Sequence, residues 1–237
     1  MADLKTRLLD LARQSHAFQR AFVADLSPAE RDAGGTWENW SIKDELAHVI
    51  AWQLNAVARL AALVDHEVLP DFSDIEKINR AIYATNRDRT LAEIVTDGDR
   101  AVADFAALIE SLSDDDLTQP ARFSDQETRP IAALALTDLY WHPVTHYSYH
   151  YLRRGDVARA AEMQQACVDA VADVTEWYGT ARYNLACFYA LSGQKDKALQ
   201  ELRESLQLRP DLIEWSQQDP DLVSLRDDPS HPVFDAS

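Results

Sequence analysis

Apolar residues recur every three to four positions through most of this 237-residue chain, and this period constrains the fold more than any other feature. In the first segment Leu4, Leu8, Leu11 and Phe22 fall on one face of a helix over residues 3–25. Only 6 glycines and 9 prolines interrupt the chain, too few for a protein of many short strands and turns. The sequence therefore predicts an all-α protein with no sheet.

Three further helical regions follow the first. Ser41 and Asp44 form a capping-box pattern that starts a helix over residues 42–64. The next region, residues 72–112, has a polar interruption and predicts a short helix followed by a long one. The last begins after Pro130 and ends near Gly155, so residues 1–155 form one domain of long helices.

Acidic side chains outnumber basic ones, with 40 Asp and Glu against 23 Lys and Arg, a net charge of −17. This balance argues against nucleic acid and against an anionic membrane surface as partners. No run of about 18 apolar residues predicts a membrane span, and the amphipathic, acid-containing start is not a signal peptide. The only cysteines, Cys167 and Cys187, favour a reducing compartment. We expect a cytoplasmic protein.

Residues 156–237 follow a different pattern. The segment that starts at Gly179 resembles the 34-residue tetratricopeptide (TPR) repeat, with small residues at Ala186 and Ala198, an aromatic at Tyr189 and a terminal proline at Pro210. The tail after it resembles the cap that follows a last repeat. The resemblance implies a TPR-like helical repeat with a C-terminal cap over residues 156–237.

A weaker repeat lies 38 positions earlier. Tyr151 aligns with Tyr189, and Gly155 aligns with Gly193. The end of the fourth helix is then also the first helix of a degenerate repeat, and no Gly- or Pro-rich linker separates the two domains.

Histidines carry the strongest chemical signal. His142, His146 and His150 are each four residues apart, and residues at i and i+4 lie on one helix face, where two imidazoles are able to share a metal ion. His48 is the obvious third donor, because it lies on a polar and aromatic stripe of the second helix. Pro143 predicts a kink that turns His142 away from the others.

Plainer interpretations remain open. The tyrosines between these histidines make the segment compatible with an aromatic packing seam, and isolated histidines are most often solvated. Asp44, Glu45 and Asp138 are acid–base candidates, although acids at such positions are usually helix caps or surface charges.

Three separated motifs occur in order along residues 1–155: WSIKDELAHVIAWQ, INRAIYATNRDRTLAEIV and the H-Y-x-x-H of residues 146–150. Together they resemble the DinB-like four-helix bundles, most closely the ClbS/DfsB branch. The resemblance implies an antiparallel bundle with a long crossover and a divalent metal ion (zinc, nickel or iron) on His48, His146 and His150. Some DinB-like relatives are thiol-dependent transferases or isomerases, and some ClbS-type relatives act on reactive small molecules in self-protection.

Two functions follow from these observations. The first is a hydrolase or thiol transferase acting on a small reactive electrophile, with the metal activating water or a thiol. A metal-free form would use His48 or Glu45 for proton transfer. The residues expected to wall the pocket are Trp52, Asn55, Trp141, Tyr147 and Tyr149.

The second function is a non-catalytic interaction or scaffold protein. Its TPR-like region would bind a basic peptide or form a homodimer. Fewer than three repeats make this region a weak groove on its own, so a capping or dimer-forming role is the more natural one.

Overall fold

The computed structural model describes residues 3–65, 67–68, 74–122 and 128–226. The chain divides into two compact units, Met1–His146 and Tyr147–Ser237. The division falls inside a helix, nine residues before the predicted boundary at residue 155. We describe each unit by itself.

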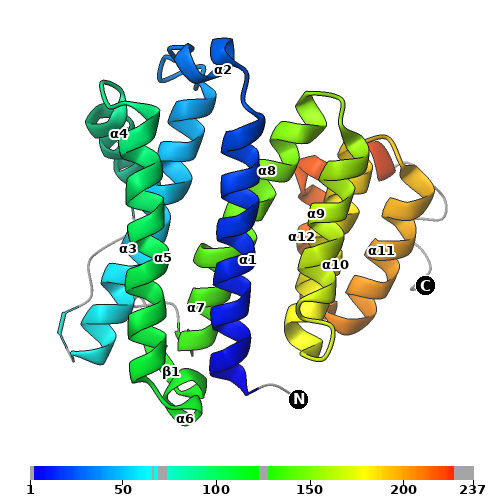
Figure 1. Ribbon diagram of the computed structural model, residues 1–237. Coiled ribbons are helices and arrows are strands. Elements are labelled where there is room, and N and C mark those ends of the chain that lie inside the picture. The colour runs from blue at the N-terminus through cyan, green and yellow to red at the C-terminus, as the bar shows by residue number, and fades with distance from the viewer. Residues whose placement is uncertain (1–2, 66, 69–73, 123–127, 227–237) are drawn as a thin grey trace. The chain divides into compact units, whose positions relative to one another are not determined.

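Long helices build the first unit (Figure 1). The all-α prediction is confirmed. The helices of this unit are α1 (Leu4–Asp25), α2 (Pro28–Asp32), α3 (Ile42–Val64), α4 (Ile75–Asn86), α5 (Leu91–Ser111), α6 (Asp114–Thr118), α7 (Ile131–Leu136), the π-helical segment η1 (Thr137–Trp141) and the start of α8 (His142–Arg153).

The helix starts follow local capping chemistry. Ser41 accepts a hydrogen bond from the backbone N–H of Asp44, and the Asp44 carboxylate accepts one in return from the Ser41 N–H. Thr90 and Glu93 make the same reciprocal pair at the start of α5. Such pairs satisfy backbone donors that a helix start leaves without partners. Helix α3 therefore begins where the sequence predicts.

The core of the first unit forms where α5 packs against α1 and α3 (Figure 1). Leu46, Val49 and Ile50 of α3 are almost fully buried. Gly98 of α5 allows the close approach, because a Cβ atom there would lie 2.4 Å from Nε2 of Gln19 and 3.0 Å from Cδ1 of Ile50. The apolar stripes predicted from periodicity are therefore the packed faces.

A small sheet corrects the expectation that the protein has no sheet. Between α6 and α7, β1 (Pro120–Arg122) pairs antiparallel with β2 (Thr128–Pro130). Pro120 lies opposite Pro130, and Arg122 lies opposite Thr128. The chain reverses between α6 and α7, so its two arms lie side by side and their backbone groups pair.

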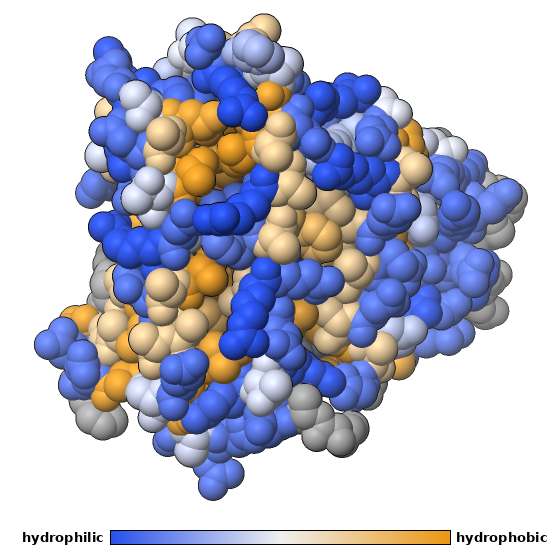
Figure 2. Space-filling model, in the orientation of Figure 1, coloured by the Kyte–Doolittle hydropathy of each residue, from blue (hydrophilic) through white to orange (hydrophobic). Residues whose placement is uncertain are grey.

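Helix α3 is the single described helix that is long and apolar enough to cross a membrane by length and composition. Its apolar window is 56% buried inside the protein, as is typical of a core helix in a soluble protein. Hydrophilic side chains cover much of the face seen in Figure 2, and apolar ones gather in separate patches.

The second unit contains the end of α8 and a series of shorter helices. They are α9 (Val157–Asp169), α10 (Thr175–Leu191), α11 (Lys195–Leu208), the 3-10 helix η2 (Pro210–Leu212), α12 (Ile213–Gln218) and the 3-10 helix η3 (Pro220–Leu225). Residues of η3 return to α10, and Leu222 and Leu225 are fully buried.

Small residues bring α10 and α11 together. Ala198 and Ser205 of α11 are fully buried, and the Ser205 hydroxyl donates to the carbonyl of Gly179 at 2.8 Å. A Cβ atom on Gly179 would lie 2.6 Å from Cγ of Arg209. Ala198 is one of the positions at which the sequence pattern requires a small side chain.

The same turn occurs twice in the second unit. Gly155 follows α8 with φ +83°, and Gly193 follows α10 with φ +76°. Behind them, the N–H of Asp156 donates to the Tyr151 carbonyl at 2.9 Å, and the N–H of Gln194 donates to the Tyr189 carbonyl at 2.8 Å. The left-handed backbone favours glycine at both places, and both turns end one helix and lead into the next.

We expect a fragment ending at residue 155 to be less stable than the full chain. Within the second unit, Ser148 accepts a hydrogen bond from Gln164 at 2.7 Å, and the guanidinium of Arg159 lies 4.3 Å from the centre of the Tyr151 ring. Truncation exposes Ser148 and Tyr151. Exposure of the tyrosine alone lowers the free energy of unfolding by about 2 kcal/mol. Thermal unfolding of the two proteins tests this, and a soluble fragment with the melting temperature of the full chain would contradict it.

Candidate metal centre

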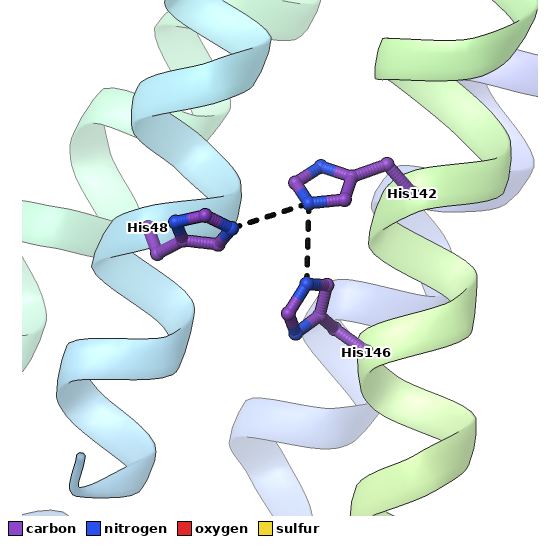
Figure 3. Close-up of side chains that lie close together, drawn as sticks. All are labelled: His48, His142 and His146. Carbon is purple, nitrogen blue, oxygen red and sulfur yellow. Dashed lines mark hydrogen bonds between the residues drawn. The ribbon is translucent and has the colours of Figure 1, made fainter. Parts of the chain in front are cut away.

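Three imidazoles converge in the first unit. Nε2 of His142 lies 3.3 Å from Nε2 of His48 and 3.1 Å from Nε2 of His146. One ligand atom from each of the three residues lies within 4.8 Å of the other two. His48 comes from α3, and the other two come from α8, as Figure 3 shows.

The π-helical segment positions His142. The N–H of His142 donates to the carbonyl of Thr137, five residues back, instead of the usual four. Pro143 therefore begins a new α-helical register at its first turn, where its missing N–H is tolerated. Because α8 is regular from His142 onward, His142 and His146 share one face.

Lys43 fixes the start of α3 to the chain that follows α4. Its ammonium donates to three backbone carbonyls, those of Asn86, Arg87 and Arg89, at 3.2, 2.7 and 3.1 Å. The carbonyls at a helix end otherwise lack partners, and a cation there also suits the helix dipole. His48 lies little more than one turn further along α3, so this contact helps to set its position.

Aromatic rings enclose His48. Trp40 lies 5.2 Å from its ring and Trp52 lies 6.4 Å from it, measured between centres. The indole N–H of Trp52 donates to the side chain of Asn79 at 2.9 Å, which fixes that ring. His48 is consequently buried, with only 7% of its surface exposed.

Burial keeps two of the rings uncharged. Burial above all, and the neighbouring His146 to a smaller extent, lower the pKa of His48 from 6.5 to about 4, although a hydrogen bond with Asn79 acts the other way. Burial, together with repulsion from His146 and His48, lowers the pKa of His142 to about 3. At neutral pH both rings are neutral, the form that ligates metal ions.

Hydrogen bonds alone do not satisfy this arrangement. Each neutral imidazole nitrogen carries either one proton or one lone pair. Nε2 of His142 faces two other nitrogens, so it forms a good hydrogen bond with only one of them. Its Nδ1 atom is buried and has no hydrogen-bond partner in the described chain. A cation that accepts all three lone pairs removes the conflict.

The spacing also fits a metal ion. Nitrogens bound at about 2.1 Å are separated by about 3.0 Å at octahedral angles and about 3.4 Å at tetrahedral angles. The measured 3.1 and 3.3 Å lie within this range. Three neutral imidazoles suit zinc, nickel and iron alike, so the donors do not select among them.

The expectation that His142 stands apart is wrong. The discontinuity before Pro143 is present, but it is absorbed as a π-helical turn and leaves His142 facing His48. His150 is not part of the group of converging nitrogens. It is buried in the second unit, with its ring 6.2 Å from that of Tyr151.

The other predicted site residues are divided between the two units, and some of them lie beside the histidines in space or in sequence. Trp52 flanks His48, Asn55 lies almost one turn further along α3, and Trp141 immediately precedes His142. Glu45 is half-buried in the first turn of α3. Tyr147 and Tyr149 belong to the second unit, where Tyr149 stacks on Phe188 at 6.5 Å, and their role in a pocket stays a prediction.

Sequence reasoning missed two contributors, His142 and Trp40. The signal for His142 was present, because it is four residues from His146 just as His150 is. Trp40 precedes the helix and falls outside the periodic pattern.

A second group of ligand-type residues lies in the second unit. Cys187, Asp219 and Asp221 have one such atom each within 4.8 Å of the others. Asp219 accepts a hydrogen bond from the Tyr183 hydroxyl at 2.9 Å and caps η3. Burial and the two carboxylates raise the pKa of the Cys187 thiol. A protonated thiol beside a capping aspartate indicates a structural role.

We predict that Lys43→Met lowers the free energy of unfolding by about 2 kcal/mol, because three carbonyls lose a charged donor. Lys77→Met is the matched control, since Lys77 is exposed on α4. Urea unfolding of both variants measures the difference. Equal free energies of unfolding for the two variants would show that the Lys43 contacts do not stabilise the folded protein.

We also predict that the metal-free protein loses stability as the pH falls. The unfolded rings bind protons near pH 6.5, whereas folded His48 and His142 do so only near pH 4 and 3. The contribution of these two rings to the free energy of unfolding is therefore fully present above about pH 6.5. Below that pH the free energy of unfolding falls, by roughly 2 kcal/mol for each ring between about pH 7 and pH 5. Replacing both rings by asparagine should flatten this dependence in urea unfolding with a chelator present. An unchanged dependence would contradict the assignment.

No curated protein sequence matches the chain at a significant level. An uncharacterised protein from Clostridium difficile 630 is similar in structure, with a TM-score of 0.55 and 12% identity, covering 66% of this chain and 99% of that one. At this identity the similarity shows the fold alone. The profile of the DinB superfamily matches residues 10–152, more than half of the chain and the part that contains all three converging histidines. The chain belongs to the DinB superfamily.

Proposed function

We propose that the protein is a metal-dependent enzyme that acts on a small reactive electrophile by hydrolysis or thiol transfer. The observation that carries this proposal is the convergence of three Nε2 atoms at 3.1 and 3.3 Å, on rings that burial keeps neutral. Metal binding is common in the DinB superfamily, which supports the same conclusion.

His48, His142 and His146 would hold the ion. A bound divalent metal supplies a lowered pKa to a coordinated water or thiol and so a nucleophile at neutral pH. The protein itself provides the aromatic surroundings of the ion. Trp40 and Trp52 restrict the His48 ring and keep water from one side of it. A low local dielectric strengthens each electrostatic contact at the site.

We further propose that the chain belongs to the ClbS/DfsB branch and protects the cytoplasm against a reactive small molecule. The motif residues that suggested this branch have structural roles at or near the site, which supports this proposal. Ser41 and Asp44 cap α3, Lys43 binds the carbonyls after α4, and His48 contributes a nitrogen to the centre.

A metal-free enzyme with His48 or Glu45 as the base is less well supported. A ring with a pKa near 4 is a weak base at neutral pH, so His48 accepts a proton poorly there.

The alternative function is that of a scaffold protein without catalysis. The α10–α11 hairpin and the repeated turns at Gly155 and Gly193 support a TPR-like extension of the kind the sequence predicted. Two hairpins are fewer than a peptide groove usually needs. We therefore propose that this extension caps the chain or forms a homodimer face.

We expect the purified protein to contain about one divalent metal ion per chain, measured by elemental analysis. His48→Ala and His142→Ala should lose the metal, whereas His150→Ala should keep it, because His150 lies outside the converging group. His16→Ala is a control, since His16 pairs with Asp99 at 2.6 Å and is not among the converging rings. Chelation should lower the melting temperature of the wild type and of the His150→Ala and His16→Ala variants, but not that of the two variants that lose the metal.

Each alternative gives a different result in the same experiment. Loss of metal in His150→Ala but not in His142→Ala would restore the ligand set that the sequence resemblance implied. A wild-type protein that binds no zinc, nickel or iron would end the metal proposal and favour the scaffold function.

A further inference from the structure

A cleft opens in the first unit beside the start of α3. Its volume is about 490 Å³, and its lining comes from the loop before α3, the first turn of α3 and the end of α4. The lining residues are Gly34, Gly35, Thr36, Trp37, Lys43, Asp44, Tyr83, Arg87 and Asp88. None of them belongs to the histidine centre.

Contacts within the protein hold this cleft open. The Tyr83 hydroxyl donates to the carbonyl of Gly35 at 3.0 Å, which ties α4 to the opposite loop. Gly35 lies so close to the cap of α3 that a Cβ atom there would be 2.1 Å from the Asp44 carboxylate. Both walls are thus fixed to helices, so the cleft is formed before any ligand arrives.

Aromatic rings connect the cleft to the histidines. Trp37 and Tyr83 line it, with ring centres 6.0 Å apart. Trp40 lies 5.6 Å from Trp37 and 6.4 Å from Tyr83, and it is nearly parallel to Tyr83 at 10°. Trp40 also lies 5.2 Å from the ring of His48. One indole therefore contacts both the aromatic lining of the cleft and a member of the histidine centre.

The polar groups of the lining favour an anion. Three acceptors of the lining already have partners: the Gly35 carbonyl binds Tyr83, the Asp44 carboxylate binds the N–H and hydroxyl of Ser41, and the Asp88 carboxylate pairs with Arg87. Among the residues that the structure describes, Arg87 uses only Nε, with Asp88 at 3.3 Å, and its side chain is 61% exposed. Its terminal N–H groups are thus available to grip a carboxylate or phosphate in a bidentate manner.

The aromatic wall disfavours a second cation. The guanidinium of Arg80 already lies over the Trp37 ring, 4.4 Å from its centre. An occupied ring face attracts a further positive charge less, whereas flat unsaturated groups still stack on the remaining aromatic surface.

We propose that this cleft binds the planar, negatively charged part of the substrate. The body of the ligand stacks on Trp37 and Tyr83, its anionic group binds Arg87, and its reactive group extends past Trp40 toward the histidines. That last step rests on the proposed function, whereas binding in the cleft does not.

Binding of simple probes to the metal-free protein tests the cleft directly. Isothermal titration calorimetry with 2-naphthoate should show binding, whereas cyclohexanecarboxylate and 2-naphthylmethylammonium should bind at least about tenfold more weakly. Arg87→Gln and Trp37→Leu should each weaken 2-naphthoate binding about tenfold. Arg100→Gln is the matched control, because its side chain is 60% exposed and pairs with a nearby aspartate, Asp97, at 3.4 Å.

Specific results would overturn the proposal. They are an absence of 2-naphthoate binding in a folded protein, equal binding by the Arg87 and Arg100 variants, or a preference for the ammonium probe. Circular dichroism confirms that Trp37→Leu is folded, and Arg87→Gln tests the same cleft from the surface. Metal content is measured separately on the same preparations. If the protein contains metal but does not bind 2-naphthoate, the cleft inference fails and the proposed function stands. If it binds 2-naphthoate but contains no metal, the proposed function fails and the cleft inference stands.

Discussion

The buried start of α3 is the constraint on which the candidate site depends. Its capping box is formed by Ser41 and Asp44, and Lys43 holds the chain after α4 against it. His48 follows within the next two turns, so the start of the helix sets both its position along α3 and the face on which it lies. A short polar network, whose members satisfy one another, thus positions one side of the histidine centre and one wall of the neighbouring cleft.

The three imidazoles are a costly arrangement for a protein that does not use them. Their nitrogens meet in a region where burial opposes protonation, and His142 cannot form hydrogen bonds with both neighbours at once. Unsatisfied buried polar groups destabilise the folded state, and native proteins tend to retain them at functional sites. This unresolved contact, rather than the mere presence of histidines, makes a metal ion the best chemical explanation of the site.

Helix α8 links the two halves of the chain in a simple way. Its first turns carry His142 and His146, and its later residues pack inside the second unit, where Arg159 lies over Tyr151. The turn after it, at Gly155, has the same form as the turn at Gly193. A helix that serves both units explains why no flexible linker separates them in the sequence.

The sequence by itself determined the helices, because periodicity and capping are local properties that Ser41, Thr90 and Gly155 express within a few residues. It also determined that His146 would share a helix face with another histidine. It did not determine which one, since His142 and His150 are both four residues away and satisfy the same rule. Only the tertiary structure decided in favour of His142. Which turn of α8 lies opposite His48 of α3 depends on packing between residues far apart in the chain.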